Sequence, residues 1–477
     1  MVSLTLSANF FGISIERDIW ILATTFLTSL CGAIWGPLNE TFRAKFIFVK
    51  EEEGEEIALK RTGSLIGFMI ITTIILSIII SFSSNFIGKK LMDDPLQEDL
   101  GLFTSILLLI LPTFLINQTT TIGISLLNSF EIYYIPEVIG TLTGLIGVSI
   151  IYFLSPIIGI YSLAISQYIS IIFLFIAIIY HINKIIPQIW EYILKIKWNL
   201  IKDFILYSLP FFFPYFIGQC NTLGEKWLAG KLGQGIISSL DYSRQFTIVL
   251  QSVLSSVLTT VMVPTLSRFF SNKDYIGFKK SFEEYIRICF LILALIIPIL
   301  IGAANPICRF FFLKGEMTLD SLKPIITLTQ LFSIAFIGVI LYIIFGIVLL
   351  SSAQNKRYAT WGVITQIIVL LLNLTFYKML SFYVFPLTTI LGHLFAAIIM
   401  GKYIPINTSA IVLKFTQYIS IITIFTILFY FFNLHIQIES AFLQLIYNLV
   451  LLLFMLPFIL KGFNYQIKPI LNKIKKW

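Results

Sequence analysis

The sequence predicts an all-α integral membrane protein that crosses the bilayer about fourteen times. Of its 477 residues, 58% are hydrophobic and only 12% are charged, whereas a soluble globular chain carries roughly 25% charged residues. Apolar runs close to the ~20 residues that a spanning helix needs recur along the whole chain. These runs lack the strict alternation of apolar and polar residues found in transmembrane barrels, so the predicted spans are helices.

The predicted spans begin with a short segment. Residues 1–11 are apolar but end at Gly12, so we expect either a short first helix or a chain that starts part-way through one. Longer apolar runs follow it at 19–48, 63–82, 102–127, 138–154, 157–182, 205–229, 236–263, 288–307, 325–350, 361–377, 385–400, 411–432 and 442–460.

The basic residues predict the orientation and the surroundings of the chain. Of the 33 Lys and Arg residues, 23 lie in one set of alternate connections and the tail, nine lie in the other set, and Arg244 lies within a span. Because basic loops stay in the cytoplasm, we expect both termini inside. The net charge is +9, and the basic residues that produce it lie in short loops between apolar runs. The expected partner is therefore the phospholipid bilayer and not nucleic acid.

Two mixed basic and aromatic stretches, 185–202 and 461–477, are each predicted to form a helix that lies along the inner headgroup layer. The alternative is a solvated linker and a solvated tail.

An internal repeat is suggested by two similar segments. Gly12 and Asp18 are six residues apart ahead of one apolar run, and Gly235 and Asp241 are six residues apart ahead of another. The two copies are six predicted helices apart, so they would cross the membrane in the same direction, as in transporters built from parallel repeats. A chance match in so biased a composition is the alternative.

Charged residues inside spans are costly and usually face a cavity. Arg244 lies about eight residues into its helix, with Asp241 one turn earlier, and an ion pair that only neutralises itself is the alternative. The remaining candidate binding residues lie near helix ends: Arg17, Asp18, Glu40, Glu225 and Lys226. For Glu40, a structural role is the favoured alternative.

Catalytic and metal-binding patterns are missing from the sequence. His181, His393 and His435 are widely separated, the four cysteines are far apart, and no phosphate-binding glycine loop with a lysine is present. We therefore expect no catalytic residues, no metal and no cofactor, and the chain is not predicted to be an enzyme.

Several short motifs resemble, in their order and spacing, those of the MurJ lipid II flippases of the MOP superfamily. The similarity covers roughly residues 10–400. The motifs are FFGIS at 10–14 before Arg17 and Asp18, PLNETF at 37–42, LLNSF at 126–130 before Ile135 and Pro136, LDYSR at 240–244, VPTLSR at 263–268 and FLKGE at 312–316.

The resemblance implies two six-helix lobes around a central cavity, which is exposed alternately to each face of the bacterial inner membrane. We accordingly expect an N-terminal lobe at 1–183, a C-terminal lobe at 184–402, and a final helix pair with a basic tail at 403–477. The expected activity is outward movement of a polyprenyl-pyrophosphate-linked saccharide, such as lipid II, by a monomer. In that family a cationic cavity meets the pyrophosphate, and Arg244 falls on one of its arginine positions.

Two departures from the family pattern leave other cargoes open. The family's first-helix arginines lie upstream of anything present here, and its second-helix arginine pair is replaced by residues 29–32, SLCG. Another lipid-linked oligosaccharide, such as an O-antigen, capsule or exopolysaccharide unit, is therefore an alternative cargo.

Functions of three other classes fit the sequence less well. An ion-coupled exporter of cationic small molecules would need an acidic cavity, whereas Arg244, Lys226 and Arg17 are basic. A sugar-polymerising membrane enzyme would need a large outer loop, and the outer loops here are short. A scaffold role conflicts with charges inside the spans.

Overall fold

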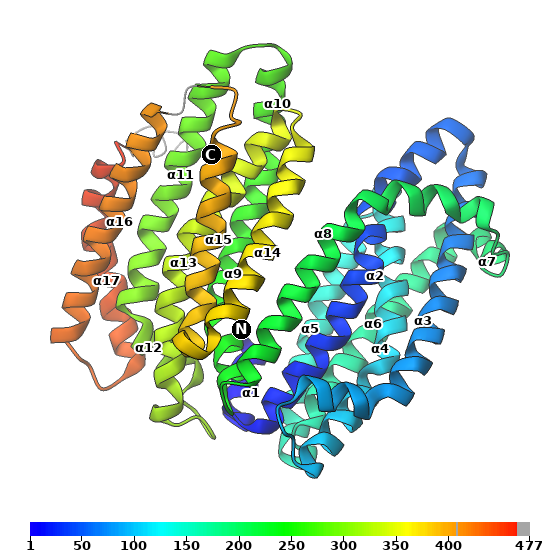
Figure 1. Cartoon of the computed structure of the whole chain (residues 1–477), viewed down its shortest axis with the longest axis horizontal. Coiled ribbons are helices and arrows are strands. Elements are labelled where there is room, and N and C mark those ends of the chain that lie inside the picture. Colours follow the sequence, from blue (N-terminus) through cyan, green and yellow to red (C-terminus); the bar gives the residue numbers. More distant parts are fainter. Residues whose placement is uncertain (407–408, 465–477) are drawn as a thin grey trace. The chain divides into compact units, whose positions relative to one another are not determined.

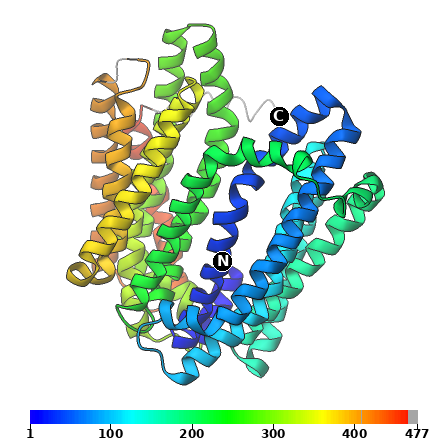
Figure 2. The same cartoon turned by 45° about the vertical axis from the view of Figure 1, so that its right-hand side comes forward.

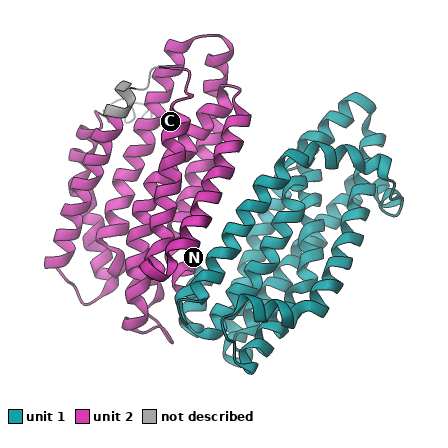
Figure 3. Cartoon of the chain, in the orientation of Figure 1, with its two compact units in different colours: residues 1–238 teal, residues 239–477 magenta. Residues whose placement is uncertain are grey.

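The computed structural model describes residues 1–406 and 409–464. The described part of the chain is helical and contains no strand (Figure 1). Its contacts divide it into unit 1, residues 1–238, and unit 2, residues 239–477 (Figure 3). The predicted tail segment 461–477 lies mostly outside the described residues.

Unit 1 holds the helices up to α8, and α9 begins at its end. Their bounds are α1 (Val2–Phe11), α2 (Ile15–Glu53), α3 (Glu55–Leu91), α4 (Gln97–Ser129), α5 (Tyr134–Ile158), α6 (Tyr161–Ile185), η1 (Pro187–Ile189), α7 (Trp190–Ile193), α8 (Trp198–Gly230) and α9 (Ile236–Val257).

Unit 2 continues from α9 to the last helix pair. Its further elements are η2 (Leu258–Met262), α10 (Val263–Ser271), α11 (Tyr275–Gly302), α12 (Ala304–Phe312), α13 (Leu319–Ser351), α14 (Asn355–Leu380), η3 (Ser381–Tyr383), α15 (Val384–Gly401), α16 (Ser409–His435) and α17 (Ala441–Gly462).

The helix lengths confirm the predicted fold class. Among the described residues, twelve helical segments are long and apolar enough to cross a membrane. One of them, Asn355–Gly401, contains two packed helices, α14 and α15. Counting these two separately and adding α1 gives fourteen, and α1 has ten residues, as expected for a short first helix. Apolar side chains such as Phe82, 89% exposed, cover the outside of these helices, where lipid would lie.

In unit 1, α2 packs along α8 in the opposite direction (Figures 1 and 2). The two helices approach closely at Gly36, where an added Cβ would collide with the ring of Tyr215. Further along the contact, the ring of Phe42 stacks on that of Phe204 with centroids 5.5 Å apart. A glycine thus permits the close approach, and aromatic burial stabilises it.

The segment between α6 and α8 differs from the predicted surface helix. It contains only the 3-10 turn η1 and the four-residue α7, which pack on α3. Gly63 of α3 lets this segment approach, since a Cβ there would lie 2.6 Å from Cβ of Tyr192, and Ser64 Oγ accepts a bond from the Lys197 N–H at 3.1 Å. The segment is therefore a connection that packs against α3.

In unit 2, the last helix pair packs on α11. The Phe290 ring lies 5.3 Å from that of Phe415 and 5.8 Å from that of Tyr418. Near them, the Lys414 ammonium pairs with a Glu283 carboxylate oxygen at 2.5 Å. An aromatic cluster and an ion pair therefore connect α16 to α11.

The unit boundary and the predicted lobes describe different properties. Unit 1 extends to residue 238 because α8 packs along α2. The lobes at 1–183 and 184–402 concern internal symmetry, which a division by contacts does not test, so they stay a prediction.

Candidate functional site

Asp18 lies near the start of α2, where Ser14 caps the helix by accepting a bond from the Arg17 N–H at 3.3 Å. The Asp18 carboxylate accepts three bonds from the beginning of α9: Gly235 N–H at 2.6 Å, Ser238 N–H at 2.8 Å and Ser238 O–H at 2.5 Å. The first N–H groups of a helix have no partner within the helix, and a carboxylate there also complements the helix dipole. Asp18, only 5% exposed, therefore caps α9 from α2.

Arg17 is also turned into the protein. It is 3% exposed, and its Nε donates to Ser7 Oγ of α1 at 2.9 Å. These contacts connect α1 to α2 and indicate a structural role. The prediction that Arg17 and Asp18 contact a substrate stays a prediction.

Glu225 and Lys226 lie in the last two turns of α8. They are 7% and 8% exposed, and the Lys226 ammonium lies 3.9 Å from a Glu225 carboxylate oxygen. Burying two opposite charges side by side limits the cost of removing each one from water.

Glu40 lies far from the other acidic candidate on α2. It is 22 residues beyond Asp18, which is about 33 Å along a helix at 1.5 Å per residue. Its exposed carboxylate accepts a bond from the Tyr215 hydroxyl at 3.1 Å. Unit 1 therefore holds two separate groups of candidate residues, one at each end of the α2–α8 contact.

Next to Glu40 lies an amide pair that the sequence reasoning missed. The Gln118 side chain, 1% exposed, donates to Asn39 Oδ1 at 2.8 Å and accepts from Asn39 Nδ2 at 3.3 Å. The thiol of Cys31 lies 3.6 Å from the same Gln118 oxygen. The polar run 117–121, NQTTT, inside an otherwise apolar span was the signal that could have revealed this pair.

Arg244 lies on α9 in unit 2. Its guanidinium carbon is 4.5 Å from the centroid of the Phe332 ring on α13. A cation over an aromatic face is attracted to the ring, and the ring holds the planar guanidinium in one orientation. Asp241, one turn earlier on α9, is half-buried like Arg244. A fork of N–H donors held in this way matches the oxygen geometry of a phosphate group.

The histidines and cysteines show no site of their own. Each of His181, His393 and His435 bonds through Nδ1 to the carbonyl four residues earlier in its helix. Across 1–406 and 409–464, no group of three or more His, Cys, Asp or Glu side chains has a geometry that would hold a metal ion.

The fold and these buried charges define a polytopic helical membrane protein. A family model described as "Lipid II flippase MurJ" matches residues 7–460. The chain therefore belongs to the lipid II flippase MurJ family, which confirms the resemblance seen in the motifs.

Curated relatives match over shorter stretches. The lipid II flippase MurJ of Burkholderia cenocepacia is 20% identical over 235 residues, which are 48% of this chain and 46% of that protein. The probable lipid II flippase MurJ of Vibrio cholerae is 25% identical over 171 residues, 35% of this chain and 32% of that protein. The matches thus span less than half the length of these relatives.

Solved structures share the fold over most of the chain. A lipid II flippase MurJ in an inward closed conformation superposes with a TM-score of 0.78 at 19% identity, covering 96% of this chain and 95% of that one. An inward-facing multidrug resistance MATE family transporter of the MOP superfamily has a TM-score of 0.70 at 11% identity, covering 84% and 93%. Both likenesses concern the fold.

Proposed function

We propose that this chain moves a polyprenyl-pyrophosphate-linked saccharide, with lipid II the favoured cargo, across the bacterial inner membrane. The observation that carries the proposal is the family match over residues 7–460. A large polar headgroup cannot cross hydrocarbon unaided because its polar groups would lose water without gaining other partners. The proposed process is therefore transport through a shielded path and not catalysis.

Within this proposal, Arg244 binds the pyrophosphate. Its guanidinium stays charged, and the Phe332 ring supports its orientation. Asp241, Lys226, Glu225, Arg17, Asp18 and Glu40 were the other predicted binding residues, and the contacts of Arg17 and Asp18 favour a structural role for those two.

We further propose that the protein acts as a monomer by alternating access, with both termini in the cytoplasm. The 23 to nine distribution of basic residues supports this orientation. A reporter fused after Glu53 should be cytoplasmic, and one fused after Asp94 should be external. Finding both reporters on the same side would contradict the orientation.

A second cargo is supported by one specific observation. At Gly32, in the segment where the family's second-helix arginine pair is absent, an added Cβ would lie 2.6 Å from Gln219 Nε2 of α8. A longer side chain at this position would need the Gln219 side chain to move away. A cavity with fewer arginines suits a lipid-linked oligosaccharide other than lipid II, such as an O-antigen or capsule unit.

Complementation tests the proposal. Expression in a bacterium depleted of its own lipid II flippase should restore growth and cell shape, whereas the Arg244→Ala variant, present at equal membrane abundance, should not. Growth of the depleted strain should fail if the cargo is another lipid-linked oligosaccharide, and a strain that lacks an O-antigen or capsule flippase should then be rescued. Rescue of neither strain by the intact protein would contradict the proposed transport.

A further inference from the structure

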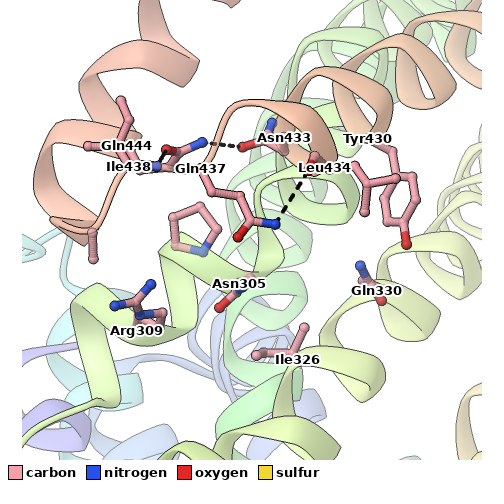
Figure 4. Close-up of a pocket in the computed structure, with 13 residues that line it drawn as sticks. Asn305, Arg309, Ile326, Gln330, Tyr430, Asn433, Leu434, Gln437, Ile438 and Gln444 are labelled. Carbon is pink, nitrogen blue, oxygen red and sulfur yellow. Dashed lines mark hydrogen bonds between the residues drawn. The ribbon is translucent and has the colours of Figure 1, made fainter.

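Unit 2 contains a cavity of about 270 Å³ between five of its helices. Its wall is formed by the end of α11, by α12 and α13, and by the α16–α17 hairpin. Figure 4 shows Asn305 of α12, Gln330 of α13 and Gln437 of the hairpin around the same space, with Tyr430 of α16 beside Gln330. So polar a lining is unusual between helices whose outer faces are apolar.

The hairpin side of the cavity is fixed by its own hydrogen bonds. The Gln444 amide donates to Asn433 Oδ1 at 3.0 Å and to the Ile436 carbonyl at 2.9 Å, and its oxygen accepts from the Ile438 N–H at 2.7 Å. Asn433 in turn donates to Asn448 Oδ1 at 2.6 Å. This wall is therefore preorganised before any ligand arrives.

The opposite wall offers groups that a ligand can use. Gln330 donates to the Ile301 carbonyl at 2.9 Å, and its side-chain oxygen accepts no bond from a described residue. Asn305 is exposed and has no side-chain hydrogen bond within the described chain. The Gln330 oxygen can accept a hydrogen bond, and the Asn305 amide can both donate and accept. Both therefore suit the hydroxyl groups of a ligand.

A cation lies at the rim of the cavity. Arg309 donates through Nη2 to the Glu439 carbonyl at 3.2 Å, while its buried Nε has no hydrogen-bond partner. No ion pair joins Arg309 to a carboxylate of the described residues. A second cation, Lys314, follows the end of α12, with its ammonium 5.9 Å from the Phe310 ring. A guanidinium with donors to spare favours a phosphate oxygen.

Apolar surface continues from the rim. The Phe310 ring stacks on that of Phe442 with centroids 6.1 Å apart, and Phe442 is 57% exposed. Leu443, beside it on α17, is 51% exposed. Acyl chains would lie against this surface.

We infer that this cavity binds the headgroup of an anionic phospholipid whose headgroup carries hydroxyl groups, as in phosphatidylglycerol. The order of surfaces follows the order of groups in such a lipid: apolar side chains for the acyl chains, Arg309 for the phosphodiester, and amides for the glycerol hydroxyls. A cation beside a pocket between membrane helices attracts anionic headgroups. The bound lipid would join α12 and α13 to the final helix pair.

Native mass spectrometry of the purified full chain tests the inference. The protein is titrated with phosphatidylglycerol, phosphatidic acid, phosphatidylcholine or inorganic phosphate. Phosphatidylglycerol should be retained best, and Arg309→Gln should weaken its binding about tenfold, since a hydrogen bond to a charged group contributes roughly a factor of ten or more. Arg309→Lys should bind at an intermediate level because it keeps the charge and loses the fork.

Two controls separate the headgroup contacts from general effects. Lys378→Gln removes one exposed cation of the same unit outside the cavity, and it should bind phosphatidylglycerol like the unchanged protein. Asn305→Ala should weaken phosphatidylglycerol but leave phosphatidic acid, which lacks the glycerol headgroup, unchanged. Monodisperse elution of each variant verifies folding.

Equal retention of phosphatidylglycerol by Arg309→Gln and the unchanged protein would overturn the site. Binding of inorganic phosphate without any lipid, or retention of phosphatidylcholine equal to that of phosphatidylglycerol, would overturn the anionic phospholipid assignment. The inference does not depend on the proposed transport, because the binding assay needs no flipping, and a failure of either leaves the other in place.

Discussion

Asp18 in unit 1 and Arg244 in unit 2 are both charged residues within spanning helices, yet they lie in different surroundings. The Asp18 carboxylate is surrounded by three donors from Gly235 and Ser238, all at 2.8 Å or less. The Arg244 guanidinium lies over the aromatic face of Phe332. A carboxylate saturated by backbone and hydroxyl donors stabilises a fold, whereas a cation supported by a ring keeps a geometry suited to an anion.

A charge inside a span is therefore not by itself evidence of a binding site. The same kind of sequence signal marks a helix cap in one region and a candidate phosphate-binding residue in the other. What separates them is the kind of group around the charge: backbone and hydroxyl donors bond Asp18, and an aromatic face supports Arg244.

The largest expected effect belongs to Asp18. Asp18→Ala should lower stability by about 3 kcal/mol or more, because each buried donor left without a partner costs roughly 1–3 kcal/mol. Asp18→Asn should lose about half as much, since it keeps one acceptor oxygen. Membrane abundance and the thermal midpoint by fluorescence-detected size exclusion measure this loss, with Glu16→Ala in the same helical turn as the exposed control. A stable Asp18→Ala protein that fails only in transport would place Asp18 with the binding residues.

Arg244 should show the reverse pattern. Arg244→Ala should reduce flipping by about tenfold or more, the equivalent of one charged hydrogen bond of roughly 1.5–3 kcal/mol, while the protein remains in the membrane. Arg244→Lys should be clearly impaired, because lysine keeps the charge and loses the planar fork.

The pairing alternative for Arg244 is tested by a double variant. If Arg244 only neutralises Asp241, both single alanine variants should be destabilised, and combining Asp241→Ala with Arg244→Ala should restore the protein. Flipping at the unchanged rate by the double variant would end the substrate-binding assignment.

A smaller effect is expected where helices touch without charges. Gly36→Ala should cost about 1–3 kcal/mol, since its new Cβ would meet the Tyr215 ring in a packed contact. Gly144→Ala, on α5 with nothing within 4 Å of the new Cβ, should cause no loss. Thermal midpoints of the two variants compare them directly. Equal midpoints would show that α2 and α8 can move apart to accept the added methyl group without loss of stability.

The smallest expected effect belongs to the hydrogen bond between Tyr215 and Glu40. Tyr215→Phe removes the bond to Glu40, a single hydrogen bond, which is worth about 0.5–1.5 kcal/mol. The thermal midpoint should fall slightly and flipping should stay near normal. If flipping is lost while stability is kept, Glu40 belongs with Arg244 as a functional residue.

Composition and periodicity alone determined the fold class, the approximate number of spans and the short first helix. The physical reason is that a backbone in hydrocarbon must satisfy its hydrogen bonds within the segment, so a long apolar run has few alternatives to a helix. The 185–202 segment carried the same mixture of basic and aromatic residues as a surface helix, but its place on α3 depends on Gly63 and could not be read locally.

Only the tertiary structure decided which polar and small residues meet. Asp18 finds its partners 217 and 220 residues further along the chain, and nothing at residue 18 encodes that distance. Helix approach in α5 occurs at Gly147, against Ser166 and Ser170, whereas an added Cβ at Gly140 or Gly144 on the same helix would meet nothing within 4 Å. Such pairings arise because close packing leaves room for one arrangement of helices, and that arrangement is a property of all the contacts together.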